Sequence, residues 1–260
     1  MRIISVNTNG IRAAARKGFF EWMLAQQADV VCIQETKAKI HQLEDEVFKP
    51  EGYFRYFEDA QKPGYSGTAI YTRHEPTRVI HGMGHEELDN EGRYIEAQFG
   101  DLSVISLYLP SGSSSEERQA VKDRFLEWFL PVLRAKAHDG RRYIICGDWN
   151  IAHKNEDIKN WRGNLKNSGF LPHEREWLTT LFDNVGWVDA FREIDQPEHS
   201  YTWWSNRGQA WANNTGWRID YHILSPNMKG EVKATAVYRD ERFSDHAPLT
   251  IDYRCEFPAK

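Results

Sequence analysis

Residues 147–150, Gly-Asp-Trp-Asn, carry an acid and an amide at the end of a short apolar run. That run, residues 143–146, contains β-branched residues and is too short for a helix, so it predicts a buried strand. Proteins of the α/β class commonly place their chemistry at such strand ends. Asp148 can accept a proton and Asn150 can donate and accept hydrogen bonds, so the pair could hold a water or a phosphate oxygen. Alone, the tetrad is more typical of an Asx turn.

Five other strand patterns also carry polar side chains at or near one end. These side chains are Asn7 and Asn9 after residues 3–6, Glu35 and Lys37 after residues 30–33, Tyr108 after residues 102–107, Asp220 within residues 217–224, and Asp245 and His246 before residues 249–253. Each is weak evidence by itself, because polar residues end most strands. Together they are difficult to explain as ordinary loops, and they predict one shared site.

The acids among these residues suit a hard cation. Glu35 and Asp245 offer carboxylate oxygens of the kind that magnesium binds, and Asn9 could complete the shell. The sequence has no Cys/His spacing of the zinc type, which makes a zinc site with sulfur ligands a poor interpretation.

The remaining residues suit the hydrolysis of a phosphate ester. Asp220 could orient the imidazole of His246, and Asp148 is free to take a proton from water. The alternative for His246 is a histidine that caps a turn. A serine nucleophile is the weaker idea, because no Gly-x-Ser-x-Gly motif occurs.

Helix patterns fill several intervals between the strands. Residues 114–117 have the form of a capping box before apolar positions at helical spacing, residues 19–24 indicate another helix, and Pro172 opens a third. Elsewhere strands follow one another directly, as in residues 94–109. This mixed order favours two packed sheets with helices outside over a singly wound parallel sheet.

Length and composition point to one domain, residues 1–260. No linker, repeat or low-complexity tract divides the 260 residues, and the three cysteines are odd in number, which favours a reducing cytosol. No signal-type or membrane-spanning apolar run is present, so we expect a soluble, cytoplasmic protein. The formal net charge of −5 argues against a polyanionic partner, but the stretch 154–166 is locally basic. An ordinary solvated loop is the alternative for that stretch.

The whole pattern resembles the exonuclease III class of AP endonucleases, within the endonuclease/exonuclease/phosphatase superfamily, and the resemblance runs nearly end to end. The matching segments are residues 7–12, 34–37, 64–67, 108–110, 147–153, 169–172, 216–221 and 244–248. The resemblance implies a four-layer α/β/β/α sandwich with its site at one edge of the paired sheets. It also implies Mg²⁺ as cofactor, with Mn²⁺ as a substitute.

The resemblance further implies a role for each residue of the site. Glu35 and Asp245 would bind magnesium with help from Asn9, Asp148 and Asn150 would position or deprotonate the attacking water, His246 with Asp220 would contact the scissile phosphate, and Asn7 and Tyr108 would support them. The chain departs from some relatives at Asn9, where they carry Asp, and at Ser111, where they carry Asn or Gln.

DNA recognition is implied in the same way. Trp203, Trp217 and Ile219 match a small pocket that accepts a flipped sugar without a base, whereas Trp204 is expected in the core. Arg207 falls where the family inserts a side chain into the duplex. The implied contacts to the DNA backbone are Arg12, Lys37, Tyr65, Asn164, Lys166 and Asn167.

The implied function is magnesium-dependent base excision repair of DNA. The enzyme would act as a monomer on duplex DNA that carries abasic sites or blocked 3′ ends, cutting 5′ to the abasic site and also showing 3′ phosphodiesterase and 3′-to-5′ exonuclease activity. The alternatives are a catalytically silent DNA-binding regulator of the same fold, or another phosphoesterase of the superfamily. The sequence sets neither the balance of the three activities nor the number of ions.

Overall fold

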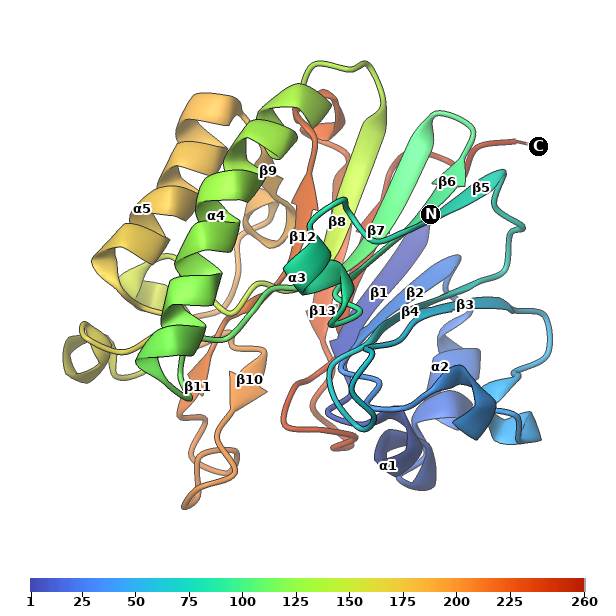
Figure 1. Cartoon of the computed structure of the whole chain (residues 1–260), viewed down its shortest axis with the longest axis horizontal. Helices are drawn as coiled ribbons and strands as arrows, with labels where there is room; N and C mark the ends of the chain where they lie inside the picture. The colour runs from blue at the N-terminus through green and yellow to red at the C-terminus, as the bar shows by residue number, and fades with distance from the viewer. Residues whose placement is uncertain (260) are drawn as a thin grey trace.

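Two six-stranded mixed sheets pack face to face, with helices on their outer sides (Figure 1). The computed structural model describes residues 1–259. The first sheet has the order β13 (Val232–Val237), β14 (Leu249–Tyr253), β1 (Arg2–Asn7), β2 (Val30–Gln34), β4 (Thr68–Thr72) and β3 (Phe54–Glu58). The second has the order β5 (Arg78–His81), β6 (Tyr94–Phe99), β7 (Leu102–Tyr108), β8 (Arg142–Asp148), β12 (Asp220–Leu224) and β9 (Val188–Asp189). The expected four-layer sandwich is confirmed.

Helices and short turns complete the chain. On the first sheet, α1 (Ile11–Arg16) and α2 (Phe19–Gln26) cover β1 and β2, whereas α4 (Glu116–Lys136) and α5 (Pro172–Thr179) cover the second sheet (Figure 1). Ser115 caps α4 by accepting a hydrogen bond from the backbone N–H of Arg118. The shorter helical segments are η1 (Ile40–Gln42), η2 (Glu46–Phe48), α3 (Glu86–Asp89), η3 (Asn155–Asp157), η4 (Trp161–Asn164), η5 (Thr180–Val185), η6 (Ala190–Glu193) and η7 (Pro226–Met228). Within residues 1–259, no helix is both long enough and apolar enough to cross a bilayer.

The apolar strands are buried on both faces. Ile3 and Ile144 lie in the cluster between the sheets, whereas their neighbours Ile4 and Ile145 pack beneath the outer helices. Side chains alternate across a strand, so a central strand with two covered faces needs apolar residues at successive positions. This explains why the central strands read as continuous apolar runs rather than as alternating patterns.

Strand direction and register bring the polar strand ends to one edge of the molecule. β1 and β2 are parallel with Asn7 opposite Gln34, and β7 and β8 are parallel with Tyr108 opposite Asp148. β12 runs antiparallel to β8 and pairs Asp220 with Asp148, so it begins where β8 ends. The carboxyl ends of both parallel pairs and the start of β12 therefore meet at one edge.

One predicted strand is wrong in its bounds. The expected strand over residues 217–224 is interrupted, because β11 (Gly216–Trp217) pairs with β10 (Trp203–Trp204) and β12 starts only at Asp220. The N–H groups of Ile219 and Asp220 both donate to Oγ1 of Thr202, at 3.1 Å each, instead of to a strand ladder. Asp220 thus lies at the start of its strand and not inside it.

Gly147 shows why β8 runs two residues beyond the predicted apolar run. A Cβ atom at this position would lie only 1.8 Å from the carbonyl oxygen of Leu107 on the neighbouring strand β7. Only glycine therefore allows the backbone of β8 to stay paired with β7 as far as Asp148.

Candidate active site

Left-handed backbone turns end the strands that reach this edge. Asn9, Glu35 and Asn150 have φ angles of 45°, 49° and 51°. Such residues cost about 1–3 kcal/mol each and persist only where their surroundings hold them. Two Asx turns do so here: the N–H of Asn9 donates to Oδ1 of Asn7, and the N–H of Asn150 donates to Oδ1 of Asp148, both at 2.9 Å. The Asx turn suggested by the tetrad is therefore present, and its acid also belongs to the site.

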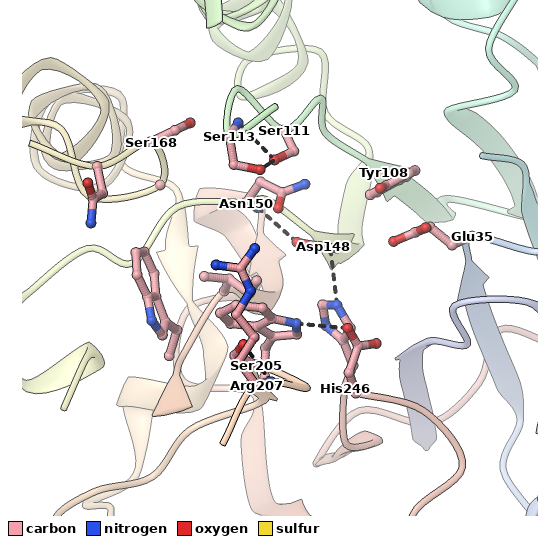
Figure 2. Close-up of a pocket in the computed structure, with 16 residues that line it drawn as sticks. Glu35, Tyr108, Ser111, Ser113, Asp148, Asn150, Ser168, Ser205, Arg207 and His246 are labelled. Atoms are coloured by element: carbon pink, nitrogen blue, oxygen red, sulfur yellow. Dashed lines mark hydrogen bonds and ion pairs between the residues drawn. The ribbon is translucent and has the colours of Figure 1, made fainter. Parts of the chain in front are cut away.

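A cavity of about 630 Å³ opens at this edge (Figure 2). Its walls combine residues from both sheets with residues from the loops that follow them. They are Glu35, Tyr108, Ser111, Ser113, Asp148, Asn150, Asn167, Ser168, Gly169, Trp203, Ser205, Arg207, Trp217, Ile219, Asp245 and His246. Most of the residues predicted for catalysis and for the abasic pocket are thus brought together around one space.

Asn7 joins carboxylates of the two sheets. Its buried side-chain amide donates to Oε1 of Glu35 at 2.8 Å and to Oδ2 of Asp148 at 3.0 Å. Its own Oδ1 is occupied by the Asx turn at Asn9. Both ends of this amide are therefore satisfied, and Glu35 and Asp148 are held on either side of it.

His246 lies between two acids. Its Nδ1 is 2.8 Å from Oδ2 of Asp220, and its Nε2 is 3.6 Å from Oδ2 of Asp148. Burial by itself would lower the pKa of His246, but Asp220 and Asp148 together raise it to about 10. The imidazole is therefore cationic at neutral pH, which suits contact with an anion such as a phosphate.

The pKa of Asp148 is raised as well, but mainly by burial. Burial raises the pKa of its carboxyl to about 7, with His246 opposing this rise and the negative Asp220 and Glu35 adding to it. A carboxyl whose pKa lies near the working pH is suited to exchange a proton with water.

Oxygen atoms in this cavity fit a hard cation. Glu35 and Asp148 each offer one carboxylate oxygen, and these oxygens and a ring nitrogen of His246 lie within 4.8 Å of one another. Asp245 lines the same cavity and accepts a hydrogen bond from Nε1 of Trp203 at 3.1 Å. Carboxylates that keep some water around the ion are the ligand set that magnesium prefers. Asn9 lies outside this cavity, and its Oδ1 accepts a hydrogen bond from Nζ of Lys37 at 2.5 Å.

Tyr108 carries a protonated hydroxyl. Burial, followed by the negative charge of Glu35, raises the pKa of its phenol well above the ordinary value, although Arg93 acts against this. The Arg93 guanidinium lies over the Tyr108 ring, 4.6 Å from its centre, and donates to the Tyr108 carbonyl at 3.1 Å. Tyr108 is thus a hydrogen-bond donor, and the guanidinium of Arg93 packs against the face of its ring.

The hairpin of β10 and β11 forms one wall of the cavity. Trp203 and Trp217 pair across it, with their ring centres 6.0 Å apart and their planes at 81°. Trp203 also bridges to the backbone of His246, which places this wall directly beside the imidazole. Ile219 completes the wall, whereas Trp204 is fully buried in a separate cluster, as its expected core position requires.

Two of the residues predicted to contact DNA, Asn167 and Arg207, line this cavity, and the others do not. Arg12 and Lys37 line a neighbouring basic cavity of about 390 Å³ with Arg16. The hydroxyl of Tyr65 accepts hydrogen bonds from Arg93 and Arg118 at 3.0 and 3.3 Å. Asn164, the last residue of η4, accepts a hydrogen bond from Nδ2 of Asn167, and Lys166 is exposed.

Three charged residues close to the site were missed by the sequence reasoning. Arg93 lies beneath Tyr108, and Lys122 of α4 pairs with Glu174 of α5 behind Asn150. A signal for Lys122 existed, because it falls on the apolar stripe of α4 with Val121 and Phe125. A charge on the buried face of a helix indicates a buried partner.

Comparisons with known proteins identify the family of this chain. Residues 4–246 match the Endonuclease/Exonuclease/phosphatase family. The chain is similar to the exodeoxyribonuclease of Bacillus subtilis (38% identity, 96% of this chain and 98% of the relative) and to the DNA repair nuclease APEX1 of Danio rerio (36% identity, 96% and 81%). Among solved structures it is similar to an AP endonuclease from Archaeoglobus fulgidus, with a TM-score of 0.88 and 26% identity, covering 98% of this chain and 100% of that one.

Proposed function

Because the chain belongs to the endonuclease/exonuclease/phosphatase family and is a DNA repair nuclease of the exonuclease III type, we propose that it cuts the phosphodiester 5′ to abasic sites in duplex DNA. The observation that carries this proposal is the position of Asp148. It lies between cationic His246 on one side and Glu35, joined to it through Asn7, on the other. A base, a cation and an acid that can bind a metal thus face one cavity.

In the proposed reaction, Asn150 orients the attacking water and Asp148 takes its proton as the water oxygen bonds to phosphorus. The bond between phosphorus and the 3′ oxygen breaks, and this oxygen leaves as a hydroxyl with a proton from solvent. His246, held by Asp220, donates to an oxygen of the scissile phosphate. Tyr108 donates a hydrogen bond from its hydroxyl to the same phosphate, and Asn7 keeps Asp148 and Glu35 apart at a fixed separation.

Glu35 and Asp245 would hold Mg²⁺, or Mn²⁺ in its place, with Asn9 supporting them. When bound, the ion stabilises negative charge on the phosphate and on the leaving oxygen. Asp245 is suited to this role because its pKa is lowered: burial would raise it, but His246, Trp203 and Ser244 outweigh that effect and keep the carboxylate ionised.

The aromatic wall supports selectivity for a sugar without a base. Trp203 and Trp217 stand edge to face across the hairpin, beside Ile219, and we propose that this wall excludes the added volume of a base. We propose that Arg207 enters the duplex and that Arg12, Lys37, Tyr65, Asn164, Lys166 and Asn167 contact its backbone. The same site would remove blocking groups at 3′ ends and digest DNA from 3′ to 5′.

A cleavage assay on a labelled duplex with one abasic site tests the proposal. With magnesium, the protein should release a product cut 5′ to the abasic site. A chelator should abolish the reaction, and an identical duplex without the lesion should stay uncut at that position. Asp148→Ala should also abolish cleavage. Asp183 is an exposed acid in η5, which follows α5, and the control variant Asp183→Asn should cleave normally. Absence of lesion-directed cleavage by the unaltered protein would refute the proposed function.

A further inference from the structure

Lys122 of α4 and Glu174 of α5 form an ion pair in which both side chains are 0% exposed. Removing two charges from water costs several kcal/mol per ion, and a well-packed apolar pair of equal volume is often as stable or more so. Stability alone therefore does not account for this pair. Its contacts point instead toward the cavity.

Lys122, one member of the pair, contacts Asn150. Nζ of Lys122 donates to the backbone carbonyl of Asn150 at 2.7 Å. The other polar groups of Asn150 are held as well: its N–H by Asp148 and its side-chain Nδ2 by the carbonyl of Leu109, at 2.9 and 2.7 Å. Three bonds thus fix a residue in a left-handed conformation and orient its side chain at the cavity wall (Figure 2).

Glu174, the other member of the pair, holds residues 169–171, which pack behind the aromatic wall. Oε1 of Glu174 accepts hydrogen bonds from the N–H groups of Gly169 at 2.8 Å and Leu171 at 3.2 Å. Gly169 packs closely on its surroundings, because a Cβ atom there would lie 3.1 Å from both the ring of Trp217 and the carbonyl oxygen of Asn150. The ion pair therefore joins the turn that carries Asn150 to the segment behind Trp217.

We propose that Lys122 and Glu174 are a positioning pair for the hydrolytic reaction. Lys122 holds Asn150 in place against the attacking water, and Glu174 holds the segment behind the pocket wall. Neither side chain contacts the substrate. This inference rests on the proposed function, since the role assigned to Asn150 comes from it.

The test is a neutral double variant, Lys122→Met with Glu174→Gln. It leaves no unpaired charge and keeps an acceptor for Gly169 and Leu171, but it removes the bond to Asn150. We expect kcat on the abasic duplex to fall by about 10–100-fold, the usual size of losses when a group that orients a reactive residue is removed. KM should change less than about twofold, because the DNA contacts remain. The melting temperature should stay near that of the unaltered protein.

The same helix offers a matched control. Lys136 lies near the C-terminal end of α4 and pairs with buried Glu96 at 3.8 Å, away from the cavity. Lys136→Met with Glu96→Gln makes the same chemical change and should leave kcat unaltered. An equal fall in kcat in both double variants would overturn the inference, because the effect would then be a general one on the helix.

A second variant keeps the inference open to refutation if the double variant folds poorly. A second neutral pair, Lys122→Gln with Glu174→Gln, leaves no unpaired charge and offers an amide donor toward the carbonyl of Asn150, so its kcat should stay within about threefold of the unaltered value. A loss as large as that of the Lys122→Met double variant would show that Asn150 is not the link. Normal kcat in a folded Lys122→Met double variant would overturn the inference as well. These results for the variants would not contradict the proposed function. The proposed function is refuted only if the unaltered protein leaves the abasic duplex intact.

Discussion

Asp148 and His246 approach each other from different sheets, with Oδ2 of Asp148 3.6 Å from Nε2 of His246. Asp148 ends β8 of the second sheet, whereas His246 precedes β14 of the first. The distance exceeds that of a direct hydrogen bond, although each charge shifts the pKa of the other group, and both side chains line the same cavity. A substrate oxygen or a water can therefore contact both groups.

Removing the acid behind the imidazole should impair catalysis without weakening DNA binding. Asp220→Asn takes away the carboxylate that is 2.8 Å from Nδ1 of His246 and that keeps the ring cationic. We expect kcat to drop by about 10²–10⁴-fold, the range typical of general acid–base and orienting groups, with KM nearly unchanged. Single-turnover cleavage of the abasic duplex measures this. Activity within twofold of the unaltered protein would contradict the role given to the pair.

Widening the aromatic wall should reduce selectivity for the lesion. Trp217→Ala removes one of the two rings that meet edge to face beside Ile219. We expect the ratio of kcat/KM for abasic over undamaged duplex to fall by at least about tenfold, because a base then fits where only a sugar did. Trp128→Ala, which changes a partly buried tryptophan of α4 that packs against the core and does not line the cavity, is the control and should keep the ratio. An unchanged ratio in Trp217→Ala would show that the wall does not select.

Basic residues beside the cavity should determine how DNA binding depends on salt. Arg12→Ala removes one cation from the basic cavity that it shares with Lys37. The slope of log affinity against log salt should become shallower by about 1, equally for abasic and undamaged duplexes. Fluorescence anisotropy in a chelator measures binding without cleavage. Arg78 is exposed on the edge strand β5, and Arg78→Ala should leave the slope unchanged. A slope in Arg12→Ala equal to that of the unaltered protein would show that Arg12 does not contact the DNA.

Protonation of a core histidine should destabilise the fold in mild acid. Burial lowers the pKa of His222 to about 3, against an unfolded value near 6.5. Below pH 6.5 the unfolded chain binds a proton that the folded protein does not, so the free energy of unfolding decreases as the pH falls toward 3. Between pH 7 and pH 5 the loss from this group is about 2 kcal/mol.

Urea denaturation at the two pH values checks this expectation. His222→Gln should be less sensitive to acid than the unaltered protein, whereas His41→Gln, which changes an exposed residue, should show the full loss. Equal pH dependence in all three proteins would mean that His222 is not the group that titrates.

Strand ends were the part of the site that the sequence could predict. Asp148, Glu35 and Asp245 each adjoin an apolar strand, and parallel neighbours end at the same edge, so local pattern was enough to group them. Arg93, Lys122 and Glu174 were not found, because a buried charge depends on a partner elsewhere in the chain. Lys122 and its partner are on different helices, and no local pattern connects them.

The broken strand before β12 has a similar cause. The residues after Trp217 have ordinary strand character, but Oγ1 of Thr202 captures the N–H groups of Ile219 and Asp220. A side chain on a separate segment thus overrides the local pattern. Asp220 reaches the edge of the site because of that contact.

The central claim is that Asp148 acts on the water while Glu35 holds the metal, although both acids lie within reach of one ion. Calorimetric titration of Mg²⁺ into the unaltered protein, Asp148→Asn and Glu35→Gln, beside single-turnover cleavage by each, tests it most directly. We expect Glu35→Gln to lose more than about tenfold in Mg²⁺ affinity, and Asp148→Asn to lose cleavage while retaining affinity within about tenfold, since a base and a ligand make different contributions. Loss of Mg²⁺ binding in Asp148→Asn as severe as that in Glu35→Gln would contradict the account.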